Sequence, residues 1–415
     1  MRIVVRRGLT VPLAGAPAPR VDRECHVARA GLLGDDLGHR RVEPLVEPEQ
    51  PVRAGTPVLR DRAEPGLLFC APVSGRVERI ETGRRRRLAA LVIAADGEDQ
   101  RRDFDVSGAG EAQGLRALLL EAGQWPALRA RPFERIASPR ATPGALFVTA
   151  LDTAPHAPDP RPVIEERAAD FDRGLAALRL LTAGPVFVCQ DPGPPLADGD
   201  DQLRVVHVVG RHPAGLVGTH IARLWPPRGG EVVWHIDYQD LIAIGHLLGH
   251  GRIDPFRIVS LSGPGCQDPR LVRVPLGADL HALAGAAAPH DHTQVLSGPV
   301  VAGRESAFLG RYHRQVTVLK RPPPRRSHWL LDALRQARRP APFIPTQSLE
   351  QTLGSAAPVV PLLRALSIAD VEAAKRLGCL HLAEEDLALA TYVTGGRTDF
   401  GRRLRAVLDH LEREA

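Results

Sequence analysis

The densest group of side chains able to do chemistry lies in the middle of the chain. His212 and His220 flank a loop rich in glycine and proline, and His235, Tyr238 and Asp240 follow it. Three histidines raise the question of zinc, but no two of them are one helical turn apart, as zinc ligands on a helix usually are. We therefore expect no metal here. Two alternatives stay open: a turn-rich loop whose histidines bond backbone groups, and a contact for a quinone or a redox partner, which needs hydrogen-bond donors beside apolar walls.

Arg129 and Arg131 belong to a second segment, residues 121–133, which follows an expected helix and precedes the first strand of the central region. In that place it resembles the flavin-binding loop of the NADH-oxidising flavoprotein subunit of respiratory complex I. Such a loop is rich in glycine because its backbone N–H groups approach a phosphate closely. Pro126 removes one donor, and Leu128 adds a side chain where a glycine is needed. The segment favours a role without flavin, in which the two arginines meet carboxylates of this chain or of a partner.

A third segment, residues 71–77, reads Ala-Pro-Val-Ser-Gly-Arg-Val and places a turn between two extended runs. It resembles the barrel-sandwich fold of biotinyl and lipoyl carriers, which present one lysine for acylation. Lys320 and Lys375 are the only lysines of the chain, so residues 1–319 contain none. The scaffold can therefore be present, but the carrier chemistry cannot.

The rest of the sequence gives no sign of an iron–sulfur cluster, a catalytic nucleophile or an acid–base pair. No two cysteines are close in sequence, so there is neither a Cys-x-x-Cys pair nor the ligand set of an iron–sulfur cluster. There is no Gly-x-Ser-x-Gly elbow and no defensible pair of carboxylates. We expect no catalytic residue and no bound cofactor in this chain, and buried thiols in a reducing compartment. The cysteines are Cys25, Cys70, Cys189, Cys266 and Cys379.

The composition fits a chain with several folded cores. Of its 415 residues, 44% are hydrophobic and 25% are charged, and the net charge is only +6. Such a small, dispersed excess of arginine does not indicate nucleic-acid binding. No apolar run approaches the roughly 20 residues that span a bilayer, and prolines interrupt an arginine-led N-terminus that otherwise resembles a weak signal peptide. Any association with a membrane is therefore expected through a partner.

Hydrophobic periodicity predicts the elements that must position these residues. Apolar strands at 146–150 and 186–188 enclose a helical pattern over 164–178. A strand–helix–strand unit of this kind is typical of a parallel sheet covered by helices. Further strands of the same sheet are expected at 205–209 and 232–236.

The chain as a whole is predicted to be a multidomain protein of the α+β and α/β classes. Quick alternation of strands with one short helix, after the parallel sheet, is typical of a β-grasp module like the SLBB domains. Helical periodicity follows a linker rich in proline and arginine, and Ser367 and Asp370 are expected to form a capping box for one helix. The expected domains are a barrel-sandwich module (1–105), a Rossmann-like α/β domain (106–255), a β-grasp module (256–320) and a linker with a C-terminal helical domain (321–415).

Several collinear motifs together resemble one family, the NqrA subunits of the sodium-translocating NADH:quinone oxidoreductase, Nqr. The resemblance runs nearly from end to end. It is most specific in residues 212–221 and 233–240, which contain five of the seven candidate residues. Further segments that fit the family are 7–15, 71–75, 125–133, 147–153, 269–273, 309–313, 377–380 and 384–389.

The resemblance implies a peripheral subunit on the cytoplasmic side of the inner membrane, held there by other Nqr subunits, mainly by NqrB in the membrane. It also implies shared ancestry with the flavoprotein subunit of complex I and with RnfC of the related Rnf complex, whose cofactors the family has lost. NADH oxidation, flavins and iron–sulfur clusters are then expected in partner subunits. Ubiquinone is a candidate ligand of this chain. The candidate contacts with quinone or a partner are Arg129, Arg131, His212, His220, His235, Tyr238 and Asp240.

Two regions depart from the family pattern. Residues 347–366 are shorter than the family's Gly-Gly-Glu-Arg segment with the stretch after it, and residues 37–40 replace its Tyr-Val-Gly-Met-type segment. These changes put the C-terminal docking surface in question, together with the quinone used and the coupling to sodium. Two other functions stay open: a flavin-binding subunit of NADH-dehydrogenase type, and a free-standing binding module on the same scaffold.

Overall fold

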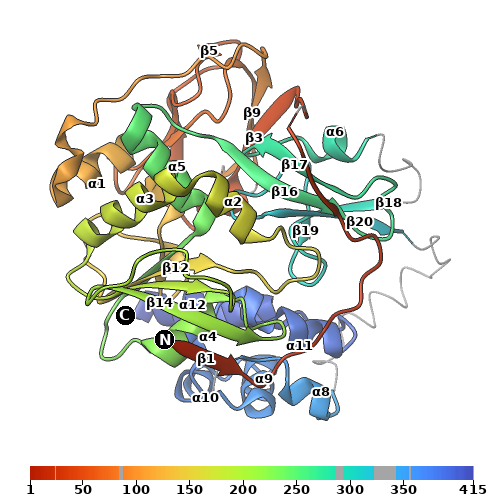
Figure 1. Cartoon of the computed structure of the whole chain (residues 1–415). Coiled ribbons are helices and arrows are strands. Elements are labelled where there is room, and N and C mark those ends of the chain that lie inside the picture. The colour runs from red at the N-terminus through yellow and green to blue at the C-terminus, as the bar shows by residue number, and fades with distance from the viewer. Residues whose placement is uncertain (24, 84–86, 286–292, 322–342, 355–356, 415) are drawn as a thin grey trace.

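The computed structural model of the chain describes residues 1–23, 25–83, 87–285, 293–321, 343–354 and 357–414 (Figure 1). Its strands form four sheets, of seven, six, four and three strands, and a group of helices follows the last strand. Among these described residues, no helix is both long enough and apolar enough to cross a membrane.

A largely parallel sheet forms the centre of the molecule. Its strands are β1 (Arg2–Val5), β10 (Arg129–Arg131), β11 (Arg135–Ile136), β12 (Ala145–Ala150), β13 (Val186–Gln190), β14 (Leu203–Gly210) and β15 (Val233–Asp237). Five neighbours run parallel in the order β1-β14-β13-β12-β15, and the antiparallel strands β10 and β11 extend the β15 edge. The central strands are apolar along their length because both faces of the sheet are covered.

Helices cover both faces of this sheet (Figure 1). They are α1 (Ala112–Glu121), α2 (Pro160–Glu166), α3 (Ala168–Leu181), α4 (Val217–Leu224) and α5 (Tyr238–His250). Phe171 and Leu178 of α3 pack with Ile236 of β15 in one core cluster. Ile221 of α4 packs with Phe147 of β12 in a second cluster. Because successive side chains of a strand point to opposite faces of the sheet, the strands contribute to two separate cores.

The helical pattern expected over 164–178 is two helices rather than one. Arg167 leaves the helical conformation, with φ −119° and ψ 31°, and separates α2 from α3. Its guanidinium lies 2.6 Å from a carboxylate oxygen of Asp170 and 2.9 Å from one of Asp254. Asp170 is three residues away in α3, whereas Asp254 lies beyond α5 in the sequence. The second partner of Arg167 is therefore tertiary, and local periodicity does not reveal it.

A six-stranded sheet follows the α/β part. Its elements are β2 (Ala18–Asp22), β16 (Phe256–Ser262), β17 (Arg270–Pro275), β18 (Thr293–Ser297), β19 (Arg304–Glu305), β20 (Gln315–Lys320) and the helix α6 (Leu280–Ala284). The strand order is β19-β18-β20-β16-β17-β2. From the sequence, residues 1–22 were predicted to belong to the N-terminal module. In the structure, β1 pairs with β14 and β2 pairs with β17. Such pairings join strands far apart in the chain, so they leave no local signal.

Two small sheets hold the remaining N-terminal residues. Their strands are β3 (Arg29–Leu33), β4 (Val42–Pro44), β5 (Pro51–Val52), β6 (Pro57–Asp61), β7 (Leu68–Cys70), β8 (Gly75–Thr82) and β9 (Leu88–Ala95). Gly75 ends the turn between β7 and β8 with φ +150°, and a Cβ there would lie 1.9 Å from the carbonyl oxygen of Ala94. This close approach to the backbone of β9 requires glycine.

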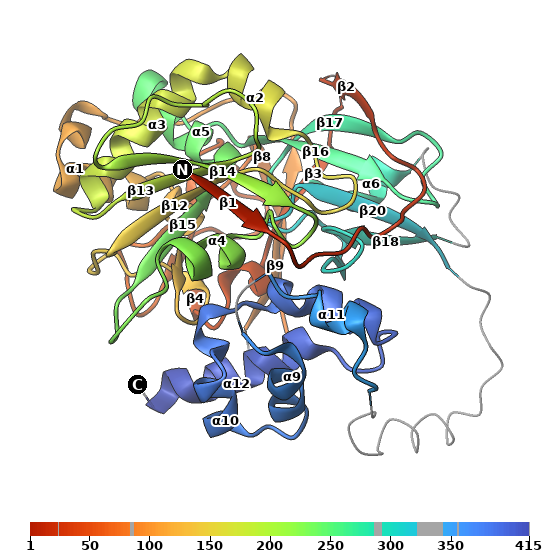
Figure 2. The same ribbon diagram turned by 60° about the horizontal axis from the view of Figure 1, so that its bottom comes forward.

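The C-terminal layer, residues 343–414 as far as described, has a hydrophobic core of its own below the central sheet (Figure 2). Its helices are α8 (Gln347–Glu350), α9 (Val359–Ser367), α10 (Val371–Arg376), α11 (Ala388–Val393) and α12 (Phe400–Glu414). Asp370 caps α10 as expected, accepting from the N–H of Ala373 at 2.9 Å. The expected role of Ser367 is wrong, because Ser367 is the last residue of α9 and donates to the carbonyl of Leu363.

A strap, residues 6–17, connects β1 to β2 and crosses from the central sheet to the six-stranded sheet (Figure 2). The N–H of Leu9 donates to the carbonyl of His212 at 2.8 Å. The carbonyl of Leu13 lies 3.1 Å from Nε2 of His156. At its far end, the carbonyl of Gly15 accepts from the N–H of Gly263 at 3.0 Å. The strap therefore makes backbone contacts with both parts of the molecule.

Candidate functional site

The seven candidate residues fall into three groups in the structure. Each group is held by contacts among its own neighbours, and each has a separate place in the fold. The groups are His212 with His220, Arg129 and Arg131 with His235, and Tyr238 with Asp240.

His212 lies at the carboxyl edge of the parallel sheet, just after β14 ends. Its Nδ1 is 3.3 Å from Oγ1 of Thr153, which follows β12 at the same edge. Ligands of open α/β sheets bind at this edge. The side chain is buried, and burial lowers the pKa of His212 to about 4, so its imidazole is neutral near pH 7. The strap contacts the backbone of His212 through the bond from Leu9.

His220 has an internal place on α4. Its Nε2 lies 2.8 Å from the carbonyl oxygen of Ala214, so the side chain closes the loop that precedes the helix. It is fully buried, and burial lowers its pKa to about 4. Two residues before it, a Cβ on Gly218 would lie 2.4 Å from a carboxylate oxygen of Asp386 in the C-terminal layer. His220 therefore supports the packing of α4 through its Nε2, while its buried Nδ1 has no hydrogen-bond partner among the described residues.

Glu134 gathers the second group. The buried guanidinium of Arg131 pairs with Glu134 and lies 3.4 Å from Asp386 of the C-terminal layer. Arg129 is 3.5 Å and His235 is 3.0 Å from the same glutamate. Burial alone would raise the pKa of Glu134, but Arg131, His235 and Arg129 lower it well below its usual value. Arg129 and Arg131 were expected to meet carboxylates of this chain or of a partner, and the structure shows them beside carboxylates of this chain.

Asp240 joins α5 to the six-stranded sheet. Its Oδ1 accepts from Arg257 of β16 at 2.6 Å, and its Oδ2 accepts from Arg314, just before β20, at 2.9 Å. All three side chains are buried. Burial acts to raise the pKa of Asp240, but Arg314 and Arg257 lower it below its usual value. Tyr238, in the same turn of α5, accepts a hydrogen bond from Gln239 at 2.9 Å.

The segment that resembles a flavin loop is packed into the core. Trp125 and Leu128 are fully buried, and the indole N–H of Trp125 donates to the carbonyl of Ala137 at 2.8 Å. The backbone N–H of Leu128 donates to the carbonyl of Trp125. The side chains of the segment thus fill the space beside it, and its amides are bonded within the chain.

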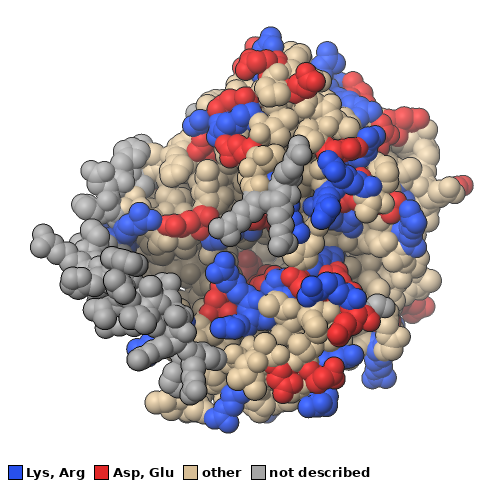
Figure 3. All heavy atoms as spheres, turned by 180° about the vertical axis from the view of Figure 1, so that it is seen from behind, with Lys and Arg blue, Asp and Glu red and all other residues tan. Residues whose placement is uncertain are grey.

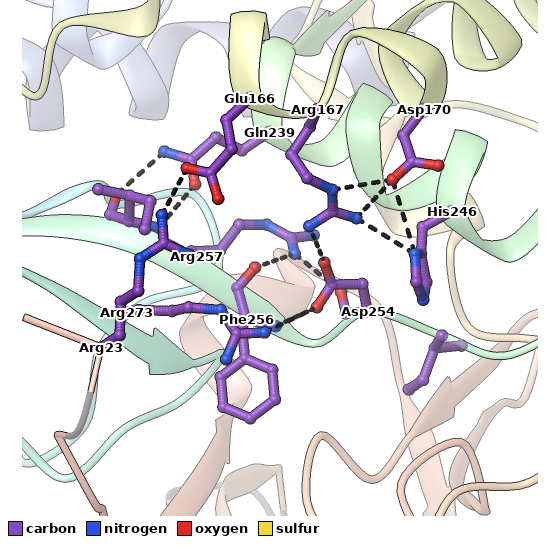
Figure 4. Close-up of polar contacts among 12 residues, drawn as sticks. Arg23, Glu166, Arg167, Asp170, Gln239, His246, Asp254, Phe256, Arg257 and Arg273 are labelled. Carbon is purple, nitrogen blue, oxygen red and sulfur yellow. Dashed lines mark hydrogen bonds and ion pairs between the residues drawn. The ribbon is translucent and has the colours of Figure 1, made fainter. Parts of the chain in front are cut away.

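Sequence reasoning missed a cavity at the junction of α2, α5, β16 and β17 (Figure 4). It has a volume of about 50 Å³. No local pattern could have revealed it, because its walls come from segments spread over most of the chain. The charged and polar residues that line it are Arg23, Glu166, Arg167, Gln239, Asp254, Arg257 and Arg273, and the apolar ones are Val163, Ile242, Phe256 and Ile258.

A second group missed in the sequence had a visible signal. His246 and His250 are one helical turn apart on α5, their ring centroids lie 4.3 Å apart, and Asp170 lies beside them. One ligand atom from each lies within 4.8 Å of the others. However, Arg167 and Arg173 both pair with Asp170, and Arg167 donates to Nδ1 of His246 at 3.2 Å. These guanidiniums already supply the positive charge that a metal ion would bring.

The surface gives no sign of a nucleic-acid interface on the face shown in Figure 3. Basic and acidic side chains alternate over that face without a large area of one sign. On that face, the arginine and lysine side chains lie among acidic ones.

Family models match three successive parts of the chain. They are described as the NqrA N-terminal barrel-sandwich hybrid domain (residues 3–96), the NqrA second alpha/beta domain (110–253) and the NQRA C-terminal domain (258–307). These matches confirm the expected barrel-sandwich module and α/β domain, and the third model carries the SLBB label expected for the β-grasp module.

Full-length relatives agree with the family models. The chain is 37% identical to the A-type subunit of the Na(+)-translocating NADH-quinone reductase of Serratia proteamaculans, covering 99% of this chain and 100% of that protein. It is 35% identical to the corresponding protein of Shewanella frigidimarina, with the same coverage. Among solved structures, an NAD+-reducing [NiFe]-hydrogenase is similar at 14% identity and a TM-score of 0.37, over 73% of this chain and 67% of that one.

The similarity to the hydrogenase, at 14% identity and a TM-score of 0.37, is too weak to indicate a shared function. The relatives, in contrast, match at more than a third of all positions and from end to end. The chain belongs to the NqrA family of the Na+-translocating NADH-quinone reductase, and is one of the subunits of that oxidoreductase complex.

Proposed function

We propose that within the reductase this chain is a docking subunit without an electron-transfer cofactor of its own. NADH oxidation, flavins and iron–sulfur clusters then lie in other subunits. The observation that carries the proposal is the burial of Trp125 and Leu128, which fill the place where a flavin loop would leave its backbone open. The five cysteines are all free thiols. Burial raises the pKa of Cys70 to about 12 and that of Cys379 to about 11, which disfavours thiolate ligands.

The visible absorbance of the purified chain tests this proposal against the flavoprotein alternative. We expect no flavin band at the stoichiometry of the protein. In membranes from cells with and without the gene, quinone-dependent NADH oxidation should fall when the gene is absent, although the chain carries no chromophore. A stoichiometric flavin would overturn the proposal, and unchanged NADH oxidation would favour a free-standing binding module.

The partner we infer is NqrB in the membrane, on the cytoplasmic face, with the C-terminal layer as the docking surface. Among the described residues, that layer carries three exposed large hydrophobic side chains, Ile344 before α8, Ile368 after α9 and Tyr392 on α11, with 81%, 71% and 48% of their surfaces accessible. Ile368→Glu should reduce co-purification with the membrane subunits. Leu45→Glu, in the N-terminal module and 38% exposed, is the matched control. Equal co-purification of both variants would contradict this choice of surface.

The parallel sheet is, in our proposal, Rossmann-like. Counted from β12 as the first strand, the four main strands follow the order 3-2-1-4, which is the order at the crevice of that fold. His212 lies at this edge beside Thr153. A neutral imidazole can donate one hydrogen bond to a quinone carbonyl. We therefore propose His212 as a quinone contact that forms when a partner of the complex is docked, because its side chain is buried in this chain.

Paired activity measurements separate this role from a structural one. His212→Ala should lower quinone-dependent NADH oxidation in the assembled complex while NADH oxidation by a soluble artificial acceptor is kept. His220→Ala, by contrast, should weaken assembly, because its contact is internal. His207→Ala on β14 is the control. If His212→Ala changes neither quinone reduction nor assembly, the loop has a structural role only.

A further inference from the structure

Four arginines meet in the cavity between the α/β part and the six-stranded sheet. Arg23 follows β2, Arg167 lies at the break between α2 and α3, Arg257 is on β16 and Arg273 is on β17. Figure 4 shows Arg167 between Asp170 and Asp254. The cavity thus gathers positive charge from four separate elements at one junction.

Three of these arginines have a close carboxylate partner, whereas Arg273 does not. Its nearest carboxylate oxygen, on Asp254, is 3.8 Å away, and among the described residues its guanidinium donates no hydrogen bond. The guanidinium lies 3.8 Å over the ring of Phe256, which fixes its plane. The pairs of the other three are Arg23 with Glu166 at 2.5 Å, Arg167 with Asp254 at 2.9 Å and Arg257 with Asp240 at 2.6 Å.

The charges near Arg273 are therefore not balanced. Burial lowers the pKa of Arg273, and among its neighbours Arg101, Arg167 and Arg23 lower it further while Asp254 raises it. An arginine offers five N–H donors in a planar fork that matches carboxylate and phosphate oxygens. The guanidinium of Arg273 is half-buried, lies among other arginines and donates no hydrogen bond among the described residues. Its N–H donors are therefore available to an anion.

The size of the cavity limits that anion. A buried water needs about 10–15 Å³ of such space, so a cavity of about 50 Å³ has room for about three or four oxygens. A phosphate group or a carboxylate with one or two waters has this size. A larger molecule could enter only with its anionic end.

We propose that this cavity binds a small oxyanion, a phosphate or a carboxylate group, with Arg273 as its principal ligand and Arg23 and Arg167 beside it. Such an anion neutralises the excess positive charge at the point where β2, α2 and β17 meet. It therefore ties the α/β part to the six-stranded sheet. This site does not depend on the docking or quinone roles proposed above.

Titration calorimetry of the full-length chain tests the site with two probes, inorganic phosphate and acetate, at constant ionic strength in chloride. Arg273→Gln should weaken the binding of the preferred probe about tenfold or more, the usual effect of losing a charge-assisted hydrogen bond. Glu166→Gln should tighten it several-fold, because it removes a negative charge from the wall and frees Arg23. Arg204→Gln is the control, since Arg204 also stacks on a phenylalanine ring, at 5.8 Å, but lies outside the cavity.

The two probes distinguish the sources of the oxyanion. Tighter binding of phosphate indicates a phosphate group, and equal or tighter binding of acetate indicates a carboxylate; both support the site. No binding of either probe above that of chloride overturns it, as does unchanged affinity in Arg273→Gln. If Arg273→Gln does not fold, Glu166→Gln decides, and an affinity equal to that of the unaltered chain then overturns the proposal.

Discussion

At the scale of single residues, buried arginines hold the candidate residues in place. Arg131, Arg257 and Arg314 are all buried, and each pairs with a carboxylate that is itself shielded from solvent. Burying a charge is costly unless it is paired and hydrogen-bonded. Asp240 is therefore the shared acceptor of two buried guanidiniums.

Replacing Asp240 with alanine should be strongly destabilising. The change leaves Arg257 and Arg314 buried without their shared carboxylate, which costs about 3–5 kcal/mol in comparable cases. The measurement is the urea midpoint of unfolding. Asp103→Ala is the matched control, since Asp103 also pairs with an arginine at 2.6 Å but in full solvent, and it should leave the midpoint nearly unchanged. Equal effects of the two changes would contradict the assignment.

The two buried histidines predict a loss of stability in acid. Burial lowers the pKa of His212 and of His220 to about 4, below the unfolded value of about 6.5. The folded state thus binds fewer protons between these values, and the free energy of unfolding falls as the pH drops from about 6.5 to about 4. At about pH 5 the loss is about 2 kcal/mol for each histidine.

Urea unfolding at about pH 7 and about pH 5 measures this loss. In His220→Gln the difference between the two pH values should fall by about a third, because one of the three histidines whose pKa burial lowers to about 4 is gone while His212 and His313 remain. His410→Gln is the control, since that side chain is half exposed on α12. A pH dependence that is the same in His220→Gln as in the unaltered chain would show that other groups cause it.

At the scale of elements, the strap decides how the first strands are used. It carries the chain from the edge of the parallel sheet to the edge of the six-stranded sheet. Gly15 has φ +76°, and a Cβ there would lie 2.3 Å from the carbonyl oxygen of Gly263. The strap thus depends on a close backbone contact that only glycine permits.

Gly15→Ala should lower the melting temperature much more than Gly97→Ala. Gly97 has nearly the same φ, +79°, but nothing lies within 4 Å of its added Cβ. Alanine at Gly97 therefore costs about 1 kcal/mol for the left-handed backbone alone. Alanine at Gly15 adds a collision with backbone that cannot move freely. Equal melting temperatures would show that the strap is not held at Gly263.

At the scale of the whole molecule, Arg131 links the central sheet to the C-terminal layer. It bridges Glu134, next to the sheet edge, and Asp386, which also accepts from the N–H of Ala383 at 2.8 Å. Arg135 adds a second link to α12, 2.7 Å from Asp409. The layer has its own core, against which Phe133 of the central part also packs. The ion pairs add directed contacts between the two parts.

Arg131→Gln should release the C-terminal layer and speed its removal by limited proteolysis. The layer should stay helical in the cleaved fragment, because its core is separate. Arg413→Gln is the control, because Arg413 lies on the same layer and, among the residues that the structure describes, its side chain donates only to the carbonyl of Asp409. Cleavage of Arg131→Gln at the rate of the control would show that the ion pairs do not orient the layer.

Many elements of this fold can be predicted from the sequence. The strands at 146–150 and 186–188 were predictable because a strand buried on both faces is apolar along its whole length. The break at Arg167 was not, because one of its two partners, Asp254, comes from a distant segment of the chain. The pair of His246 and His250 could have been predicted from its spacing of one helical turn, but it was missed.

The sequence by itself determined the family, the order of the first three domains and the chemistry that the chain cannot perform. A missing lysine excludes an acylated carrier, and scattered cysteines make no Cys-x-x-Cys pair, because these chemistries need particular atoms at particular spacings. Only the tertiary structure decided which charges meet. Arg131 and Asp386 are 255 residues apart, and the four arginines of the cavity span positions 23 to 273. Local patterns encode burial within one element, whereas ion pairs and cavities depend on how elements pack together.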